Sequence, residues 1–504
     1  MRVALRALAA AVREDRLLAL ATGSIVYLIV VQLPISDPDL GWHLAAGAEI
    51  ARTHRVPTVD PFGYPIAGQP WIAYSWLAEL VLWWVTTRVG AHALVALTAL
   101  LAGASAVVVY RTCRDAGSAA VPAFLASLLG ALAALPYTSQ RPVVASFLLA
   151  AVFARALLRH RRGLDVRLWA LVPLMALWAN VHVFFVVGLG WLWAGAGWDA
   201  GRRIVRGRGD GGRRLAAVAL ACSLATLCTP YGSELLVHLL VLGQQPVTHA
   251  KVVEFTSPDF HLPITWPALA LVLATVAALA AGRARRDPFG VLLVLGHLAL
   301  GLLVQRNLPF LAIVAAPVVA LAATRALGLG AQVAAPPVPH RVAIQAAAAA
   351  LFVVAPLLRL PHDPSLEAHL TPGAFPTAAV QFVRAQPPLG RMFNSFGWGG
   401  YLIHELYPRY QVSMDGRTQT WGPLVADYMT THYVREGWHG YLDRLHPDFV
   451  LWERHAPLAL ALATDPGWTQ VYADDVAVLF VRADHPLRAR LLQAARPAPE
   501  AHAG

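Results

Sequence analysis

The chain has few charged residues and few cysteines. Charged side chains make up only 14% of the 504 residues, whereas 57% are hydrophobic. A soluble globule of this length needs more charge on its surface, so a water-soluble fold is excluded and a membrane protein is expected. The three cysteines all lie in or beside apolar runs, so neither a disulfide framework nor a thiolate metal site is expected.

The sequence contains long runs of apolar residues with few charges. Runs of about 15 to 22 residues recur between short basic or Pro/Gly-rich loops, and this length spans the hydrocarbon core as a helix. The pattern predicts an all-α membrane fold, a polytopic bundle of about eleven transmembrane helices. The expected spans are residues 17–35, 91–110, 118–136, 142–158, 168–180, 183–198, 215–230, 264–282, 288–304, 308–324 and 342–358.

The net charge of +11 gives information on how the chain is oriented in the membrane. In a soluble protein it would suggest nucleic acid as a partner, but here the arginines cluster at the ends of apolar runs, so no nucleic acid is expected. Arginines from Arg2 to Arg16 precede the first span, which predicts an uncleaved anchor and a cytoplasmic N-terminus. The other basic loops, expected on the same side, are residues 111–114, 159–162, 202–214, 283–286 and 325–341.

The opposite side receives the longer polar segments. A membrane domain over residues 1–357, with a long first outer loop at 36–75, precedes a small extracytoplasmic α/β domain over 358–504. A short helix at 76–87 is expected to lie in the membrane interface. Expected strands lie near 391–395, 411–414, 448–453, 469–473 and 476–481, and expected helices near 401–406, 424–436 and 458–463.

Two acids open the first outer loop, directly after the first span. Pro38 suits the first residue of a helix, so Asp37 is expected to be either its N-cap or a chemical group. Asp39 and His43 are four residues apart and share a helix face, so both could point into one cavity or bridge a divalent cation. Alternatively, Asp39 complements the helix dipole. Asp60, within an Asp-Pro pair, predicts a turn.

Polar residues also interrupt later apolar runs. Asn180 and His182 lie at the expected tip of the hairpin 168–198, where they either line a cavity or satisfy backbone groups freed by the helix break. Arg306 lies between two spans on the outer side, which favours binding of a phosphate over snorkelling to lipid headgroups. Arg141 is a second candidate of this kind. Glu254 is an exposed loop acid unless its loop folds back over the membrane core.

Two glycine-containing turns stand out in the C-terminal domain. The sequence 394–401 runs from a strand through glycines into a helix, and it lacks the spacing of a phosphate-binding fingerprint, so a tight strand-to-helix turn is expected. Asp415-Gly416-Arg417 predicts a turn with a local ion pair, with a sugar or peptide contact as the alternative.

Taken together, these features resemble the GT-C glycosyltransferase superfamily. The first loop, Asp-x-Asp-x-x-Trp-His-Leu from Asp37, is similar to a bacterial branch of it, and the motifs at 178–182, 229–232, 399–401 and 415–417 look like the same branch. The resemblance implies that Asp39, with Asp37 beside it, is the catalytic base or a metal-linked group. It also implies a polyprenyl-phosphate-linked sugar as donor, which a phosphate-binding Arg306 would fit.

The expected function is therefore a polyprenyl-phosphate-sugar-dependent glycosyltransferase on the outer face of a bacterial cytoplasmic membrane. Its acceptor, a glycan, lipid or protein, stays open, because the first loop has no contiguous Asp-Glu pair and the C-terminal domain no Trp-Trp-Asp motif. A transporter or flippase for a lipid-linked saccharide and a non-catalytic assembly subunit are the alternatives. The expected substrate-binding residues are Arg306, His43, His182, Asn180, Arg141 and Glu254.

Overall fold

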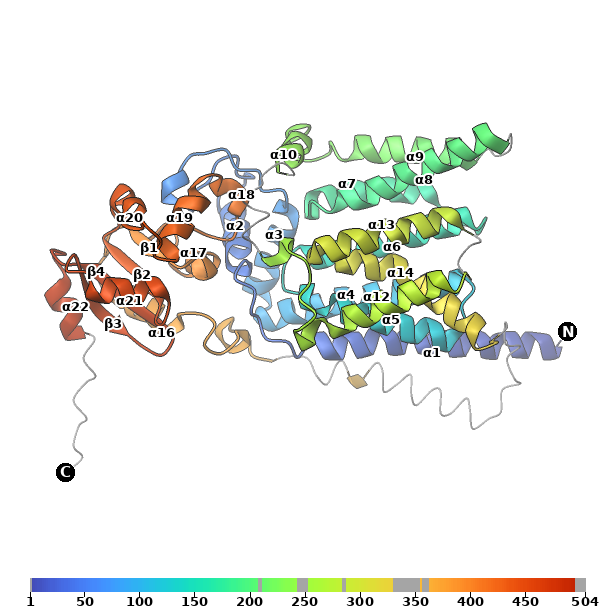
Figure 1. Ribbon diagram of the computed structural model, residues 1–504, viewed down its shortest axis with the longest axis horizontal. Coiled ribbons are helices and arrows are strands. Elements are labelled where there is room, and N and C mark those ends of the chain that lie inside the picture. Colours follow the sequence, from blue (N-terminus) through green and yellow to red (C-terminus); the bar gives the residue numbers. More distant parts are fainter. Residues whose placement is uncertain are drawn as a thin grey trace, which may run out of the picture. The chain divides into compact units, whose positions relative to one another are not determined.

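The computed structural model describes residues 2–206, 211–242, 253–282, 287–329, 354–355 and 362–494 (Figure 1). Chain contacts divide the protein into two compact units. The helical unit comprises residues 1–33, 88–237 and 251–364, and the mixed unit comprises 34–87, 238–250 and 365–504. The first outer loop thus belongs to the same unit as the C-terminal segment. A domain boundary near residue 358 falls outside the described residues and stays a prediction.

The helical unit is a bundle of apolar helices, several of which lie side by side in Figure 1. Its helices are α1 (Arg2–Val30), α4 (Ala91–Asp115), α5 (Ala120–Ala134), α6 (Val143–Arg161), α7 (Leu171–Val181), α8 (Phe185–Arg206), α9 (Gly211–Ala225), α12 (Trp266–Ala280), α13 (Pro288–Leu303) and α14 (Leu308–Ala326). The mostly buried α14 contacts α4, α5, α6, α12 and α13. Small residues allow close packing, because a Cβ on Gly103 of α4 would lie 2.7 Å from the Gly23 carbonyl oxygen of α1.

The expected count of about eleven transmembrane helices is not supported. Helices occur at ten of the expected positions, but within the described residues only five are long and apolar enough to cross a membrane. These are Ala91–Asp115, Ala120–Tyr137, Val143–Arg161, Pro263–Ala280 and Gln305–Ala326. Two more apolar helices, Leu168–Val181 and Pro288–Leu303, are shorter, and the eleventh expected span, 342–358, lies almost wholly outside the described residues. The five helices indicate a membrane protein.

The mixed unit contains a four-stranded sheet in the order β1-β2-β4-β3. The strands are β1 (Met392–Asn394), β2 (Phe449–Glu453), β3 (Trp468–Ala473) and β4 (Ala477–Arg482). β1 pairs in parallel with β2, and the other two pairings are antiparallel. Four expected strands are thus confirmed, whereas the strand expected at 411–414 is wrong, because Val412 makes only an isolated bridge with Gly63.

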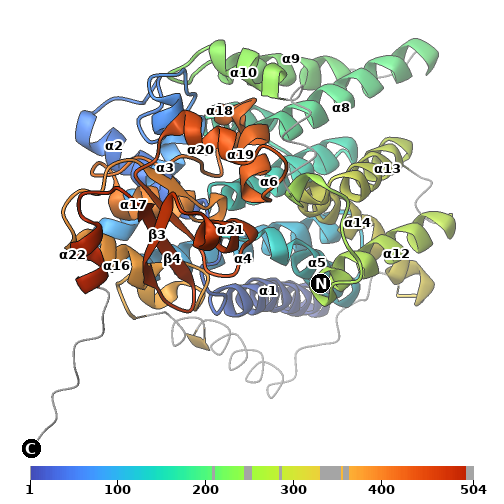
Figure 2. The same cartoon turned by 60° about the vertical axis from the view of Figure 1, so that its left-hand side comes forward.

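Short helices accompany the sheet. They are α16 (Thr377–Ala385), α17 (Gly399–Leu406), α18 (Thr418–Trp421), α19 (Leu424–His432), α20 (His439–Leu445), α21 (Pro457–Thr464) and α22 (Arg488–Ala494). Helices α16 and α21 contact the sheet, and Figure 2 shows both beside its strands. The expected helices at 401–406, 424–436 and 458–463 correspond to α17, α19 and α21. Residues 394–401 form the expected strand-to-helix turn between β1 and α17.

The first outer loop supplies α2 (Leu40–Thr53) and α3 (Trp76–Arg88) to the mixed unit. Glycines bring α2 against its neighbours. A Cβ on Gly41 would lie 2.2 Å from the Gly400 carbonyl oxygen of α17, and a Cβ on Gly47 would lie 2.2 Å from the Glu79 carbonyl oxygen of α3. Any larger residue at either glycine would force these backbones apart. The helix expected at 76–87 is therefore confirmed as α3, and its place in the membrane interface stays a prediction.

Candidate functional site

Helix α2 begins later than its sequence suggests. Leu40 is its first residue and Asp39 its N-cap, so Asp37 is not the cap. The reason is local, because the Asp37 carboxylate accepts the backbone N–H of Asp39 at 2.9 Å and so closes a turn before the helix starts. Asp39 is half-buried, and its backbone carbonyl accepts the N–H of His43.

The Asp39 side chain lies against the turn formed by Asp415, Gly416 and Arg417. A Cβ on Gly416 would lie 1.7 Å from the Asp39 Oδ1, so only glycine leaves room for the carboxylate in this position. The two motifs are nearly four hundred residues apart in the chain, yet they are packed together in the mixed unit. Two segments that the resemblance singled out therefore form one local structure.

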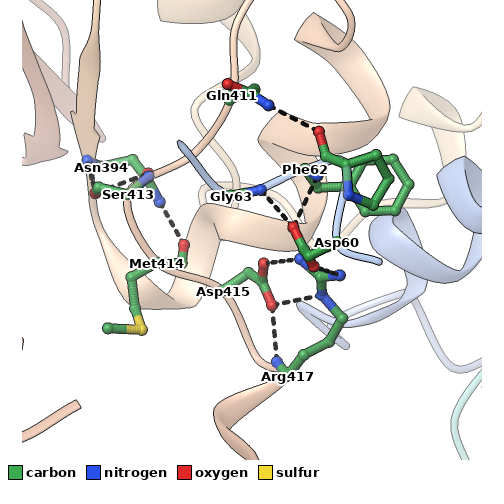
Figure 3. A network of polar contacts seen from close by, with 10 residues as sticks. Asp60, Phe62, Gly63, Asn394, Gln411, Ser413, Met414, Asp415 and Arg417 are labelled. Carbon is green, nitrogen blue, oxygen red and sulfur yellow. Dashed lines mark hydrogen bonds and ion pairs between the residues drawn. The ribbon is translucent and has the colours of Figure 1, made fainter. Parts of the chain in front are cut away.

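Arg417 is the centre of a buried ion network (Figure 3). Its guanidinium donates from Nη2 and Nε to the two Asp415 oxygens at 2.6 and 2.9 Å, and from Nη1 to Asp60. Asp60 also accepts the backbone N–H groups of Phe62 and Gly63 at 2.9 and 2.7 Å, so it makes the expected turn. The ion pair expected within 415–417 is confirmed.

Burial and charge oppose each other in this network. Burial raises the pKa of Asp60, and the Arg417 guanidinium counteracts this rise. Burial alone would lower the pKa of Arg417, but Asp415 and Asp60 outweigh it and hold this pKa above its usual value. The side chains of Asp60, Asp415 and Arg417 are fully buried. Their ion pairs link the first outer loop to the C-terminal segment.

Aromatic rings and amides complete the surroundings of Arg417. The guanidinium carbon lies 4.8 Å from the ring centroid of Trp71 and 5.2 Å from that of Phe62, which adds cation–π attraction. The Asn394 side chain of β1 holds Ser413 and Met414 in place (Figure 3). Its amide oxygen accepts the N–H of Ser413 at 2.8 Å, and its amide nitrogen donates to the Met414 carbonyl at 2.9 Å. These side-chain bonds replace the ladder expected at 411–414.

His43 faces a buried acid that the sequence reasoning did not single out. Its Nδ1 lies 3.0 Å from the Oε1 of Glu79 on α3, and both side chains are buried. Burial raises the pKa of Glu79 to about 8, although the Arg417 charge opposes the rise. The signal in the sequence was a single acid within the otherwise apolar run of α3.

The expected cation at Asp39 and His43 gains no further ligands. Among the residues that the structure describes, no three His, Cys, Asp or Glu side chains are grouped so that they could hold a metal ion. The His43 ring nitrogen is instead engaged by Glu79. A divalent cation held by Asp39 and His43 therefore stays a prediction.

A second cluster lies in the helical unit and joins two arginines through one acid. Glu254 accepts from the Arg141 Nη2 at 2.7 Å and lies 3.4 Å from the Arg306 Nη1. Burial alone would raise the pKa of Glu254, but the two guanidinium groups outweigh it and hold this pKa below its ordinary value. Glu254 is thus ionised at neutral pH, and its loop does fold back onto the helices.

The hairpin tip lies at this cluster. Helix α7 ends at Val181 and α8 begins at Phe185, so the expected break is confirmed. Burial, followed by the charges of Arg306 and Arg141, holds the pKa of His182 well below its ordinary value, so the imidazole is neutral. Asn180 donates to the backbone carbonyls of Ala176 and Cys228 at 2.8 Å, and its expected part in lining a cavity stays a prediction.

The structure thus gathers the expected site residues in two groups. Asp37, Asp39 and His43 lie in the mixed unit, and Arg141, Asn180, His182, Glu254 and Arg306 lie in the helical unit.

No protein-family model matches the chain, and no curated protein sequence matches it. The fold is similar to that of a solved oligosaccharyltransferase. The crystal structure of the Archaeoglobus fulgidus oligosaccharyltransferase in the apo form is similar with a TM-score of 0.56, at 13% identity, over 93% of this chain and 74% of that chain.

At this identity the likeness shows the fold alone, so membership of the GT-C glycosyltransferase superfamily stays a prediction. Neither the bacterial branch nor the Asp37-x-Asp39 motif is confirmed by it.

Proposed function

We propose that this protein is a membrane glycosyltransferase that takes its sugar from a polyprenyl-phosphate donor on the outer face of a bacterial cytoplasmic membrane. The observation that carries the proposal is the Arg141–Glu254–Arg306 cluster. The oligosaccharyltransferase-like fold and the apolar helices support it. The acceptor is a hydroxyl group of a glycan, lipid or protein.

The charge of the cluster suits a phosphodiester. Two guanidiniums and one carboxylate leave a single positive charge, and His182 beside them is neutral. A polyprenyl-phosphate sugar carries one negative charge, and guanidinium groups match phosphate oxygens with two parallel hydrogen bonds. Arg306 lies at the start of the apolar segment Gln305–Ala326, where a lipid-linked phosphate would meet it.

Asp39 is the proposed general base, and Asp37 sets its backbone by the hydrogen bond described above. The carboxylate takes the proton of the acceptor hydroxyl. The acceptor oxygen then forms a bond to the anomeric carbon while the bond from that carbon to the phosphate oxygen breaks. The electron pair leaves with the phosphate.

The test is a transfer assay with purified protein, a panel of radiolabelled polyprenyl-phosphate hexoses and pentoses, and cell-envelope acceptor fractions. We expect D39N to lower the transfer rate by about two to four orders of magnitude, as loss of a general base does. R306Q should lower it by about two to three orders. The matched controls D443N and R167Q remove exposed charges outside both groups and should leave the rate unchanged.

An unchanged transfer rate in D39N would contradict the proposed base, and an unchanged transfer rate in R306Q would contradict the proposed phosphate site. If no donor in the panel is consumed but labelled lipid-linked sugar crosses proteoliposome membranes, the protein is a transporter rather than a transferase.

A further inference from the structure

A cavity of about 650 Å³ lies within the mixed unit, apart from the residues proposed for catalysis. It is lined by the first outer loop at Tyr64 and Pro65, by residues 390–391 and 407–411, and by 444–445 at the end of α20. This volume lies in the range of small-molecule sites. Nothing in the proposed transfer reaction uses it.

Three arginines line this cavity. Arg391, Arg409 and Arg444 are all exposed, and Arg444 pairs with Asp427. A second acid, Asp448, accepts the backbone N–H of Arg391 at 2.6 Å. Three guanidiniums against two carboxylates leave the cavity positive. Among the residues described, neither Arg391 nor Arg409 has a carboxylate partner, but the Arg409 guanidinium donates to the backbone carbonyls of Arg384 and Gln386. The Arg391 guanidinium therefore has the most to gain from an anionic ligand.

Three tyrosines line the cavity as well. The guanidinium of Arg391 lies 6.0 Å from the ring centroid of Tyr64, and Tyr407 packs edge-on against Phe62. The Tyr410 hydroxyl accepts the N–H of Leu389 at 3.0 Å, so its ring is held in place. Rigid aromatic rings beside guanidinium groups provide flat apolar surface next to positive charge.

We infer that this cavity binds an acidic oligosaccharide. The carboxylates or phosphates of such a ligand would pair with the guanidiniums, and its sugar rings would pack on the tyrosines. Single-stranded nucleic acid also combines negative charge with flat rings. It requires an extended basic groove that tracks the backbone, whereas this site is a single pocket.

The experiment is a binding titration of the full-length protein in detergent, without any sugar donor. The probes are pentagalacturonate, neutral maltopentaose and oligothymidylate. We expect pentagalacturonate to bind at least about tenfold more tightly than maltopentaose, because each guanidinium–carboxylate bond is charge-assisted. R391Q should weaken pentagalacturonate binding about tenfold, whereas R435Q, the same loss of charge at an exposed arginine outside the cavity, should change it less than about twofold.

Equal binding of pentagalacturonate and maltopentaose would overturn the inference, as would equal effects of R391Q and R435Q. Tighter binding of oligothymidylate would assign the site to nucleic acid instead. Since the titration needs no donor and no transfer, its failure would leave the proposed transferase activity standing, and a failed transfer assay would leave this site standing.

Discussion

The Asp39 carboxylate occupies the space that any side chain at Gly416 would need. A Cβ there would lie 1.7 Å from Oδ1 and 2.8 Å from the carboxylate carbon. The turn that carries Gly416 is itself fixed by the buried network of Arg417. The position of the proposed base is therefore set by a residue from the far end of the chain.

Replacement of Gly416 by alanine should move the base rather than unfold the protein. A carboxylate at the end of a side chain can shift, so we expect the free energy of unfolding to change by no more than about 1 kcal/mol. The transfer rate should fall towards that of D39N. G440A is the matched control, because the space around Gly440 is open. A normal rate in G416A would show that the position of the carboxylate does not matter.

Replacement of Arg417 by methionine should be strongly destabilising. It would leave Asp60 and Asp415 buried without a counter-charge, which typically costs about 3 to 5 kcal/mol. Thermal unfolding of the purified protein measures the loss. The triple variant R417M/D60N/D415N removes the uncompensated charges, and it should recover part of the stability. If R417M unfolds no more readily than R435M, the network does not hold the unit together.

The pair of His43 and Glu79 should make stability depend on pH. A carboxyl group whose pKa is raised from 4.5 to about 8 on folding binds its proton more tightly in the folded state. Its contribution to stability is therefore complete below about pH 4.5 and falls as the pH rises towards 8. E79Q, which cannot ionise, should flatten this part of the curve in thermal unfolding between these pH values. A curve unchanged by E79Q would contradict the raised pKa.

Removal of the acid in the second cluster should strengthen anion binding. In E254Q the guanidiniums of Arg141 and Arg306 lose their shared carboxylate, so the local charge rises by one. We expect inorganic phosphate to bind about tenfold more tightly, with a steeper dependence on salt. D259N, in the same segment and paired with the exposed His261, is the control. Weaker phosphate binding in E254Q would mean that Glu254 orients the arginines.

Local features were predictable from sequence, whereas long-range pairs were not. The break at the hairpin tip, four of the strands and the ion pair within 415–417 followed from residue types a few positions apart. The partnership of Arg417 with Asp60 spans 357 positions, and nothing local distinguishes Asp60 from any other turn aspartate. The sequence therefore predicted the turns that contain Asp60 and Arg417, but not the ion pair between these two residues.

At α7, α9 and α13 the count of membrane spans failed for a different reason. Hydropathy measures how apolar a run is, whereas crossing a membrane also requires helix length. Helix α7 has 11 residues, and at a rise of about 1.5 Å per residue it reaches only about 16 Å of a core about 30 Å thick.

The contact between Gly41 and Gly400 has a practical consequence for anyone who wishes to produce a water-soluble piece of this protein. A fragment cut at residue 365 would leave a groove along α17 where α2 belongs, and Arg417 would have lost one of its two counter-ions. Such a fragment would aggregate and fold poorly. Splicing residues 34–87 ahead of 365–494 through a short glycine-serine bridge would restore both the covered groove and the missing acid.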